Sequence, residues 1–325
     1  MDKSLLRWGI IGCGDVTEVK SGPAFNKVPQ SMLVAVMRRN AAKAEDYARR
    51  HGVEKWYSDA AALINDPDVD AVYVATPPLQ HEEYTIMALQ ARKPVYVEKP
   101  MAISAGAAER MARAAVENGV KLSVAHYRRQ QPVFLKIKAL LEEGAIGKPR
   151  VVNLQCLQPH KDPMITRTED AWRYNPAVSG GGLFFDLAPH QLDLMLYFFG
   201  SPVKASGLSL NASGLYNADD TTIGQVLFPQ DLLFSGTWCF TAPEKRDQCD
   251  IFGTAGSLHF SIFDHQRLVL RQASGEITFN FDALPHVQQP MIQHVVAYFL
   301  NRGPNPCSAE DGVTVMRMMA AITDR

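Results

Sequence analysis

The sequence predicts an α/β N-terminal domain with a doubly wound parallel sheet, followed by an α+β C-terminal domain with a large, mostly antiparallel open sheet. A buried-strand pattern leads directly into a glycine turn, and apolar strands then alternate with helices through the first third of the chain. Beyond about His126, period-two segments replace this alternation. We therefore expect one domain over residues 1–125, a second over 126–308, and a final helix over 309–325 that packs back on the first.

The first strand, over residues 5–11, ends in a turn of the kind that holds a pyrophosphate. Gly12 lets the chain bend sharply, Gly14 lets the backbone approach a ligand, and the free N–H groups that open the next helix favour an anion. Glycine pairs also serve ordinary tight turns. A helix over 15–27 and a strand over 32–37 complete a βαβ unit, however, which favours a dinucleotide. The residues expected to bind it here are Gly12, Gly14, Asp15, Val16 and Thr17, the last standing where Gly or Ala is usual.

The remaining elements follow from apolar runs and their stop signals. Thr76-Pro77-Pro78 ends an apolar strand, and Gly119 ends a helix. In the first domain we expect further helices over 41–51, 59–64, 80–91 and 104–118, and strands over 71–75, 94–98 and 120–125. In the second domain we expect antiparallel strands over 150–155, 222–228, 232–240 and 268–270.

Composition favours small-molecule chemistry. The 325 residues include 33 basic and 34 acidic side chains, for a formal charge of -1, so neither a nucleic acid nor a membrane surface is an expected partner. The five cysteines are scattered and form no C-x-x-C pair, and the histidines show no metal-like spacing, so we expect no metal site. The N-terminus lacks a signal-peptide pattern, which suits a cytoplasmic protein.

A second motif begins with three glycines, Gly180 to Gly182, and runs into a helix. Asp186 is a good N-cap, and Pro189 is expected in the first turn. Asp186 and His190 are four residues apart and so share one helix face. A capping Asp and a hydrogen-bonded core His would explain the pair structurally, whereas the glycines favour close approach of the backbone to another group, for which a cofactor face is one candidate.

These residues together resemble the Gfo/Idh/MocA oxidoreductases, the family of glucose-fructose oxidoreductase and inositol dehydrogenase. The resemblance spans nearly the whole chain. It rests on Gly12-x-Gly14, Ala75-Thr76-Pro77-Pro78 with His81, Val97-Glu98-Lys99-Pro100, Trp172-Arg173, and Gly180 to Gly182 leading to Asp186-x-x-x-His190. It implies an N-terminal Rossmann domain, a cis Lys99-Pro100 bond, catalytic roles for Lys99, Asp186 and His190, and homodimers or homotetramers built on the C-terminal sheet.

The chemistry of an NAD(P)-dependent dehydrogenase or reductase explains the same residue types. When a hydride leaves a carbinol carbon, the hydroxyl proton must leave too, and His190 suits that transfer. Lys99 follows a parallel strand, at the edge where such sheets bind ligands, and its ammonium favours oxyanion character. Asp186 would orient His190 or share substrate protons. We expect Thr76, Pro77, His81 and Glu98 to line the nicotinamide-ribose side.

Cofactor choice depends on the end of the second strand. NAD enzymes usually place an acidic side chain there, but this chain has Arg38 and Arg39. A guanidinium binds a 2′-phosphate in bidentate fashion, so the sequence favours NADP over NAD. Alternatively, both arginines simply open a solvated helix.

The expected substrate is a sugar, a polyol or a related carbonyl compound. Arg128 lies in His126-Tyr127-Arg128-Arg129, which departs from the Asn-x-Arg pattern of relatives, and is a candidate substrate contact. Trp172 and Tyr174 are further candidates, since aromatic rings stack on polyols, although packing explains them too. Two alternatives stay open: a nucleotide-sensing protein on the same fold, and a glycosidase-like redox enzyme that retains NAD.

Overall fold

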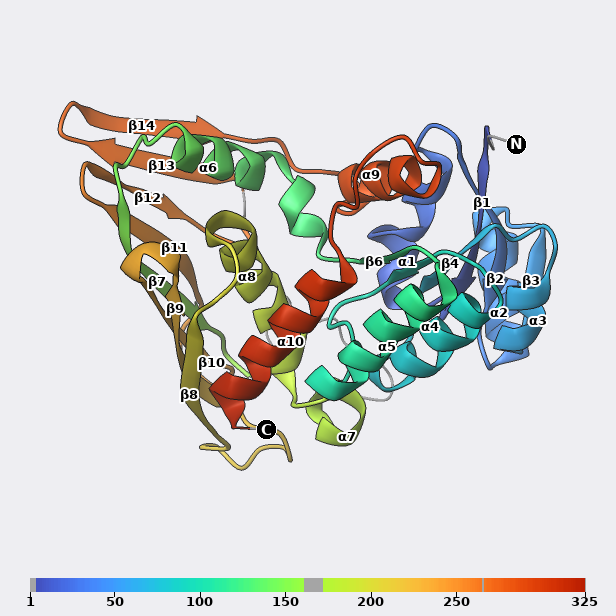
Figure 1. Cartoon of the computed structure of the whole chain (residues 1–325). Coiled ribbons are helices and arrows are strands. Elements are labelled where there is room, and N and C mark those ends of the chain that lie inside the picture. The colour runs from blue at the N-terminus through green and yellow to red at the C-terminus, as the bar shows by residue number, and fades with distance from the viewer. Residues whose placement is uncertain (1–3, 161–171, 265, 325) are drawn as a thin grey trace. The chain divides into compact units, whose positions relative to one another are not determined.

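The computed structural model describes residues 4–160, 172–264 and 266–324, and the backbone divides into two units. The first unit comprises Met1–Arg128 and Pro285–Met316, and the second comprises Arg129–Leu284 and Arg317–Arg325. Each unit contains one sheet (Figure 1).

The first unit contains a six-stranded parallel sheet in the order β3-β2-β1-β4-β5-β6, which confirms the predicted doubly wound fold. The order reverses between β1 and β4, the point at which open α/β sheets bind ligands beyond the carboxyl ends of their strands. The strands are β1 (Leu6–Ile11), β2 (Ser31–Met37), β3 (Lys55–Tyr57), β4 (Ala71–Val74), β5 (Val95–Val97) and β6 (Leu122–Val124).

Helix boundaries in the first unit follow local capping chemistry. α2 (Ala41–His51) starts after Asn40, whose side chain accepts the Lys43 N–H, and ends at Gly52 in the left-handed region. α5 (Ala105–Asn118) starts after a capping serine and ends at Gly119, as predicted. The other helices and 3-10 turns here are η1 (Gly22–Asn26), α3 (Ala60–Asn65), η2 (Pro78–Gln80), α4 (His81–Gln90) and α9 (Gln289–Phe299).

The first helix is shorter than predicted. α1 spans only Asp15–Val19, and the chain then turns into the separate η1. Pro23 has no backbone N–H to continue the ladder. A Cβ on Gly22 would lie 2.2 Å from the carbonyl oxygen of Thr17, so the chain folds back against α1 at a point where only glycine fits. The predicted single helix over 15–27 is therefore wrong.

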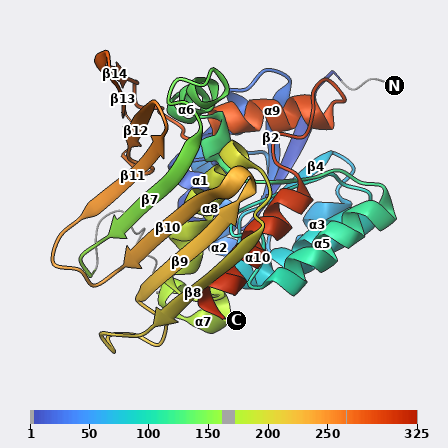
Figure 2. The same ribbon diagram turned by 60° about the vertical axis from the view of Figure 1, so that its left-hand side comes forward.

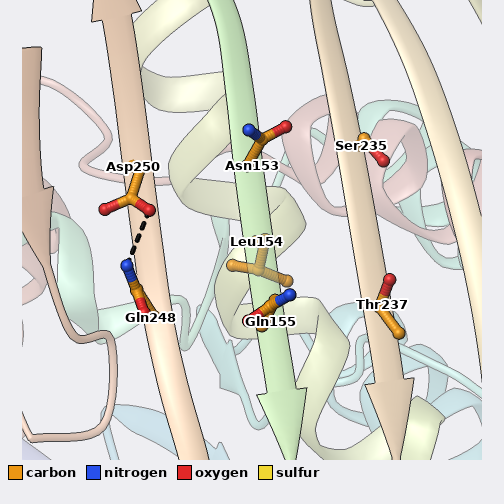
Figure 3. A pocket seen from close by; sticks show the side chains of 7 residues that line it. All are labelled: Asn153, Leu154, Gln155, Ser235, Thr237, Gln248 and Asp250. Carbon is orange, nitrogen blue, oxygen red and sulfur yellow. Dashed lines mark hydrogen bonds between the residues drawn. The ribbon is translucent and has the colours of Figure 1, made fainter.

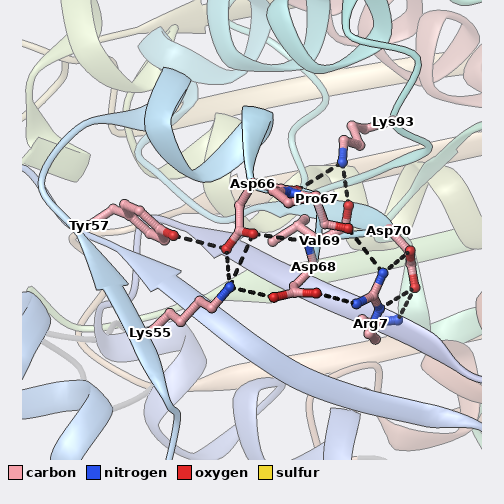
Figure 4. Close-up of polar contacts among 9 residues, drawn as sticks. All are labelled: Arg7, Lys55, Tyr57, Asp66, Pro67, Asp68, Val69, Asp70 and Lys93. Atoms are coloured by element: carbon pink, nitrogen blue, oxygen red, sulfur yellow. Dashed lines mark hydrogen bonds and ion pairs between the residues drawn. The ribbon is translucent and has the colours of Figure 1, made fainter.

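A charged network lies at the amino-terminal edge of this sheet (Figure 4). Arg7 at the start of β1 donates to Asp70 at 3.0 Å and to Asp68 at 2.7 Å, and Lys55 at the start of β3 donates to Asp66 at 3.0 Å and to Asp68. Burial opposes the charge on Asp66, but the Asp68 amide and Lys55 more than offset it, so the pKa of Asp66 is lowered. The network joins β1, β3 and the loop before β4, at the edge opposite the ligand side.

The second unit contains an eight-stranded sheet in the order β14-β13-β12-β11-β7-β10-β9-β8 (Figure 2). Every pair is antiparallel except β7 with β10, which confirms the predicted mostly antiparallel sheet. The strands are β7 (Pro149–Leu157), β8 (Lys204–Leu210), β9 (Thr221–Phe228), β10 (Leu232–Cys239), β11 (Arg246–Gly253), β12 (Gly256–Phe260), β13 (Arg267–Gln272) and β14 (Gly275–Asn280).

One face of this sheet is covered by α6 (Pro132–Glu142) and α8 (Leu183–Phe199). In β10, Phe234 and Trp238 are buried beneath the helices, whereas Leu233 points to the other face and is 55% exposed. This alternation is typical of a sheet with one covered face. The short elements of the unit are η4 (Trp172–Tyr174), α7 (Pro176–Ser179) and η5 (Pro229–Asp231), and η3 (Tyr127–Gln130) crosses the boundary between the units.

The last helix, α10 (Ala309–Thr323), contributes to both units. In the first unit, a Cβ on Gly312 would lie 2.6 Å from the sulfur of Met101. In the second unit, Ile322 packs against Gly207 of β8 and Gly224 of β9. Among the described residues, no helix combines the length and the apolar character needed to cross a bilayer.

Candidate active site

The predicted pyrophosphate turn lies between the carboxyl ends of β1 and β4. Gly12 has a φ of +95°, and a Cβ there would lie 2.6 Å from the backbone nitrogen of Thr76, so the turn requires glycine. At Gly14 the nearest atom to a Cβ is 3.9 Å away, which leaves room beside the backbone. Within the described chain, the buried Oγ1 of Thr76 has no hydrogen-bond partner. An open glycine turn beside an unsatisfied hydroxyl fits a bound dinucleotide.

The other residues of the turn take distinct positions. Thr17 is fully buried, and its hydroxyl donates to the Gly14 carbonyl at 2.8 Å, so it stabilises the turn from behind. Val16 is partly buried and Asp15 is exposed, both in the first turn of α1. Burial raises the pKa of Cys13 to about 11, with Arg38 acting in the opposite direction, so this thiol stays protonated near neutral pH.

Arg38 lies directly after β2 and beside the glycine turn. Its Nη1 donates to the carbonyl oxygen of Cys13 at 3.4 Å, and its own amide donates to Tyr57 at 3.1 Å. Arg39 is exposed, and Asn40 caps α2. The position usually held by the acidic residue of NAD enzymes therefore carries two cations and an amide.

His81 joins the end of β4 to the turn after β5. Its Nδ1 lies 2.9 Å from the carbonyl oxygen of Pro100, and its Nε2 lies 2.7 Å from that of Thr76. Burial lowers the pKa of His81, although both carbonyls and Glu98 favour the protonated ring. The ring contacts two backbone turns, so His81 positions the Thr76-Pro77 segment rather than presenting a ring nitrogen outward.

Glu98 is the centre of a buried hydrogen-bond network. Its Oε1 accepts from the hydroxyl of Tyr73 at 2.5 Å and from Nε2 of Gln288 at 2.6 Å, and its Oε2 accepts from the amide of Lys99 at 3.0 Å. Gln288 lies just before α9 and also contacts Tyr96. The Glu98 carboxylate thus fixes the backbone at Lys99. The network around Glu98 was not predicted from the sequence, because its partner Gln288 lies 190 residues away along the chain.

Lys99 follows β5 at the carboxyl edge of the parallel sheet and is partly exposed. The Lys99-Pro100 peptide bond is cis, which confirms the prediction. Lys99 belongs to the first unit, whereas Asp186 and His190 belong to the second.

Asp186 and His190 lie on α8, but the helix begins earlier than predicted. α8 starts at Leu183 after Gly182, so Asp186 is in the first turn and is not the N-cap, and Pro189 lies inside the helix. Both expectations are wrong because Leu183, Phe184 and Phe185, which precede Asp186, are apolar and buried, and helix formation satisfies their backbone groups. The four-residue spacing still places both side chains on one face.

Gly182 brings another loop close to the start of α8. Its φ is +81°, and a Cβ there would lie 2.4 Å from the Cβ of Ala218. The loop that carries Ala218 connects β8 to β9. The close neighbour that requires glycine at position 182 is therefore the loop between β8 and β9 of the same unit.

Asp186 is paired with Arg173. The Nε of Arg173 lies 2.9 Å from Oδ2 of Asp186, and both side chains are largely buried. The guanidinium also lies over the Trp172 ring, 4.4 Å from its centroid. The pair holds the Asp186 carboxylate in one orientation, and Trp172 supports the arginine.

One aromatic ring packs against His190, and a carboxylate holds the loop that provides this ring; neither was predicted. The ring of Phe263 packs edge-on against the His190 imidazole, with centroids 5.8 Å apart and planes at 82°. Asp247 holds the loop that presents Phe263, because its carboxylate accepts from the Phe263 amide at 2.7 Å and the Asp264 amide at 3.2 Å. No local sequence pattern marks this contact, because it depends on the pairing of β11 with β12.

A buried ion pair anchors the same helix. Arg129 donates to Asp193 through Nη2 at 2.7 Å, and the two residues are 5% and 1% exposed. Asp193 is three residues after His190 on α8. Arg128, the predicted substrate contact, is in the first unit and buried, with its guanidinium 5.6 Å from the Tyr127 ring centroid.

Comparison with known proteins agrees with this architecture. Residues 6–126 match the oxidoreductase family with an NAD-binding Rossmann fold, and residues 134–259 match the GFO/IDH/MocA C-terminal domain. The solved structure of levoglucosan dehydrogenase in complex with NADH superimposes with a TM-score of 0.88 at 24% identity, over 98% of this chain and 95% of that one, and so shares the fold.

Curated relatives cover nearly the full length. The chain is 44% identical to Oxidoreductase P35 of Formosa agariphila over 317 residues, which is 98% of each chain. It is 29% identical to the 1,5-anhydro-D-fructose reductase of Ensifer adhaerens over 316 residues, or 94% of this chain and 92% of the relative. The chain therefore belongs to the Gfo/Idh/MocA family and is an NAD(P)-dependent oxidoreductase.

Proposed function

We propose that the enzyme transfers a hydride between a nicotinamide cofactor and a CH–OH or carbonyl carbon of a sugar or polyol, with Lys99 and His190 as proton-transfer groups. This proposal rests on one observation: in each unit, neighbouring side chains fix the position of one of these two proton-transfer groups. Glu98 fixes the backbone of Lys99, and Phe263 packs against His190. The names of the relatives, which include sugar and inositol oxidoreductases, support the substrate class.

The protein groups account for the proton in this reaction. A bound nicotinamide would supply the acceptor for the hydride of the carbinol carbon. His190 takes the hydroxyl proton, so a carbonyl and an imidazolium form together, and the reverse reaction returns that proton. The Lys99 ammonium stabilises negative charge on the same oxygen. Asp186, held by Arg173, favours the imidazolium through its charge on the same helix face.

We further propose that the enzyme prefers NADP. Arg38 is held beside the glycine turn by the Cys13 carbonyl, where a 2′-phosphate on the adenosine ribose would meet its guanidinium. Asn40, unlike a carboxylate, adds no repulsion. Thr76, with its unsatisfied hydroxyl, and Pro77 are proposed to line the cofactor, while His81 and Glu98 hold their backbone turns.

Self-association through the C-terminal sheet is also proposed. Strand pairing aligns Leu227, Leu233, Val151 and Phe252 in one row on the uncovered face, where Leu233 is 55% and Phe252 39% exposed. The adjacent row is polar and lines a shallow pocket together with neighbouring residues (Figure 3). Its side chains include Asn153, Ser235 and Asp250. An apolar row beside a polar one favours a specific homodimer or homotetramer interface.

The test of the proposed activity measures turnover and cofactor binding separately. Purified wild type, Lys99→Met and His190→Asn are assayed with NADP⁺ and NAD⁺ against sugars, inositols and anhydrosugars, and NADPH binding is followed by its fluorescence. We expect turnover in wild type and a loss of about 100- to 10,000-fold in kcat for each variant, with NADPH binding retained.

Lys204→Met, at an exposed position on β8, is the matched control for the loss of a lysine charge. Turnover that survives unchanged in both active-site variants would exclude Lys99 and His190 as proton-transfer groups. A wild-type protein that binds no pyridine nucleotide would exclude the activity itself.

A further inference from the structure

Three aromatic rings of the second unit form a cluster outside the reaction chemistry described above. Tyr174 and Tyr216 lie 4.8 Å apart between ring centroids. His160 lies 6.0 Å from Tyr216, in a nearly parallel orientation, and 6.1 Å from Tyr174. His160 is exposed and both tyrosines are partly exposed, so the cluster presents aromatic surface to solvent.

The loop that carries Tyr216 has a fixed shape. Asn211 accepts the Gly214 amide at 2.9 Å and donates to the Tyr216 carbonyl at 2.6 Å. Asp220 accepts the amides of Ala212 at 3.1 Å and Ser213 at 2.9 Å. Hydrogen bonds with Asn211 at one end and with Asp220 at the other therefore hold this loop in place. A loop held in this way presents its aromatic ring at a defined position.

Tyr216 carries an unsatisfied polar atom. Its hydroxyl oxygen is buried and has no hydrogen-bond partner among the residues that the structure describes. Burial raises the pKa of Tyr216, so the phenol is neutral and is a donor at physiological pH. A buried hydroxyl without a partner is costly, which favours a ligand group as its acceptor.

The cluster adjoins the proposed catalytic helix. Tyr174 directly follows Arg173, whose Nε bonds Asp186 at 2.9 Å. The Tyr216 loop also packs against Gly182, the residue before α8, through Ala218. From Asp186 outward, the contacts run through Arg173 and Tyr174 to Tyr216. Two side chains thus separate Tyr216 from Asp186.

We propose that Tyr174, Tyr216 and His160 form a subsite for a second sugar ring, so that the preferred substrate is a glycoside or disaccharide. Aromatic faces pack against the C–H face of a pyranose, and the phenol and imidazole offer hydrogen bonds to its hydroxyls. Because two side chains intervene, the ring on this cluster is not the ring that reacts at His190. This subsite rests on the proposed sugar oxidoreductase function and names its substrate class.

The test compares two-ring and one-ring probes. Cellobiose, maltose and xylobiose are compared with D-glucose and D-xylose by saturation-transfer NMR in the presence of NADPH, and by kcat/KM where turnover occurs. For Tyr216→Ala we expect about tenfold weaker binding of the two-ring probe and an unchanged affinity for the one-ring probe. Tyr216→Phe keeps the ring and loses only the hydroxyl, so its loss should be smaller. Leu215→Ala, at an exposed neighbour in the same loop, is the control and should match wild type.

The outcomes separate the two proposals. Equal affinity of wild type and Tyr216→Ala for every two-ring probe, or no saturation transfer to any of them, overturns the subsite. Continued turnover of one-ring sugars in that case leaves the proposed function intact. Loss of one-ring and two-ring binding alike in Tyr216→Ala, with circular dichroism matching wild type, also overturns a subsite specific to the second ring. Absence of both NADPH and NADH binding in wild type refutes the oxidoreductase function independently.

Discussion

The proposed preference for NADP depends on Arg38. Its guanidinium lies at the glycine turn and contacts the Cys13 carbonyl. Removing it deletes a charge-assisted contact to a 2′-phosphate but none to a ribose hydroxyl pair that lacks the phosphate. We expect Arg38→Ala to reduce the NADPH over NADH preference by about tenfold, corresponding to roughly 1.4 kcal/mol.

Fluorescence titration with both reduced nucleotides measures this preference directly. Arg49→Ala, on the exposed surface of α2, removes an equal charge away from the turn and serves as the control. A wild-type preference for NADH, or a ratio that does not change in Arg38→Ala, would contradict the assignment.

At the same scale, local chemistry made some residues predictable and hid others. The positions of Gly12 and Lys99 could be predicted because a glycine turn and the end of a strand are each encoded by a few neighbouring residues. The partners that fix the site, Gln288 for Glu98 and Phe263 for His190, are distant in the sequence, and no local pattern marks them. The cofactor and substrate roles themselves stay predictions.

Among helices and strands, the fold class and the approximate bounds of α2, α3, α4, α5 and α10 were predictable because caps and strand patterns are local signals, whereas α6, α7 and α9 had no predicted counterpart. The start of α8 was not predictable, since burial of Leu183, Phe184 and Phe185 outweighed the capping preference of Asp186. The length of α1 was also missed, because it depends on how closely Gly22 approaches Thr17 in space. Tertiary packing decided both.

The charged network at the amino edge of the parallel sheet gives the fold a defined acid sensitivity. The pKa of Asp66 is lowered in the folded state from an ordinary value of 3.8. Its contribution to stability is therefore complete above about pH 3.8 and is lost as the pH falls through the lower folded-state pKa. We expect Asp66→Asn to lower the free energy of unfolding by about 1–3 kcal/mol at pH 7.

Urea unfolding at a series of pH values checks this sign. The difference between wild type and Asp66→Asn should shrink as the pH falls below about 3.8, because the carboxylate then becomes protonated in the unfolded chain and, at lower pH, in the folded protein too. Asp46→Asn, on α2, removes a carboxylate whose side chain is 45% exposed, and should give a small difference at every pH. If the difference in the free energy of unfolding between wild type and Asp66→Asn instead widens on acidification, the network does not stabilise the charged form of Asp66.

At the scale of the whole molecule, the uncovered sheet face predicts self-association. Leu233 lies at the centre of the apolar row, so a charge there would be buried without a partner in an oligomer. In sedimentation velocity experiments, we expect Leu233→Glu to lower the sedimentation coefficient from that of the oligomer to that of the monomer. Val116→Glu, at an exposed apolar position on α5, should leave the assembly unchanged. A wild-type protein that sediments as a monomer at micromolar concentration would exclude this interface.

The proposed proton transfer requires Lys99 and His190 to act on the same oxygen of the substrate. A crystal structure of the ternary complex with NADP⁺ and a sugar identified by the activity screen tests this most directly. We predict that Nζ of Lys99 and a ring nitrogen of His190 each lie within about 3 Å of one substrate oxygen, whose carbon faces the nicotinamide. A complex in which either side chain lies beyond hydrogen-bond reach of that oxygen, with no water between them, would contradict the proposed roles of Lys99 and His190.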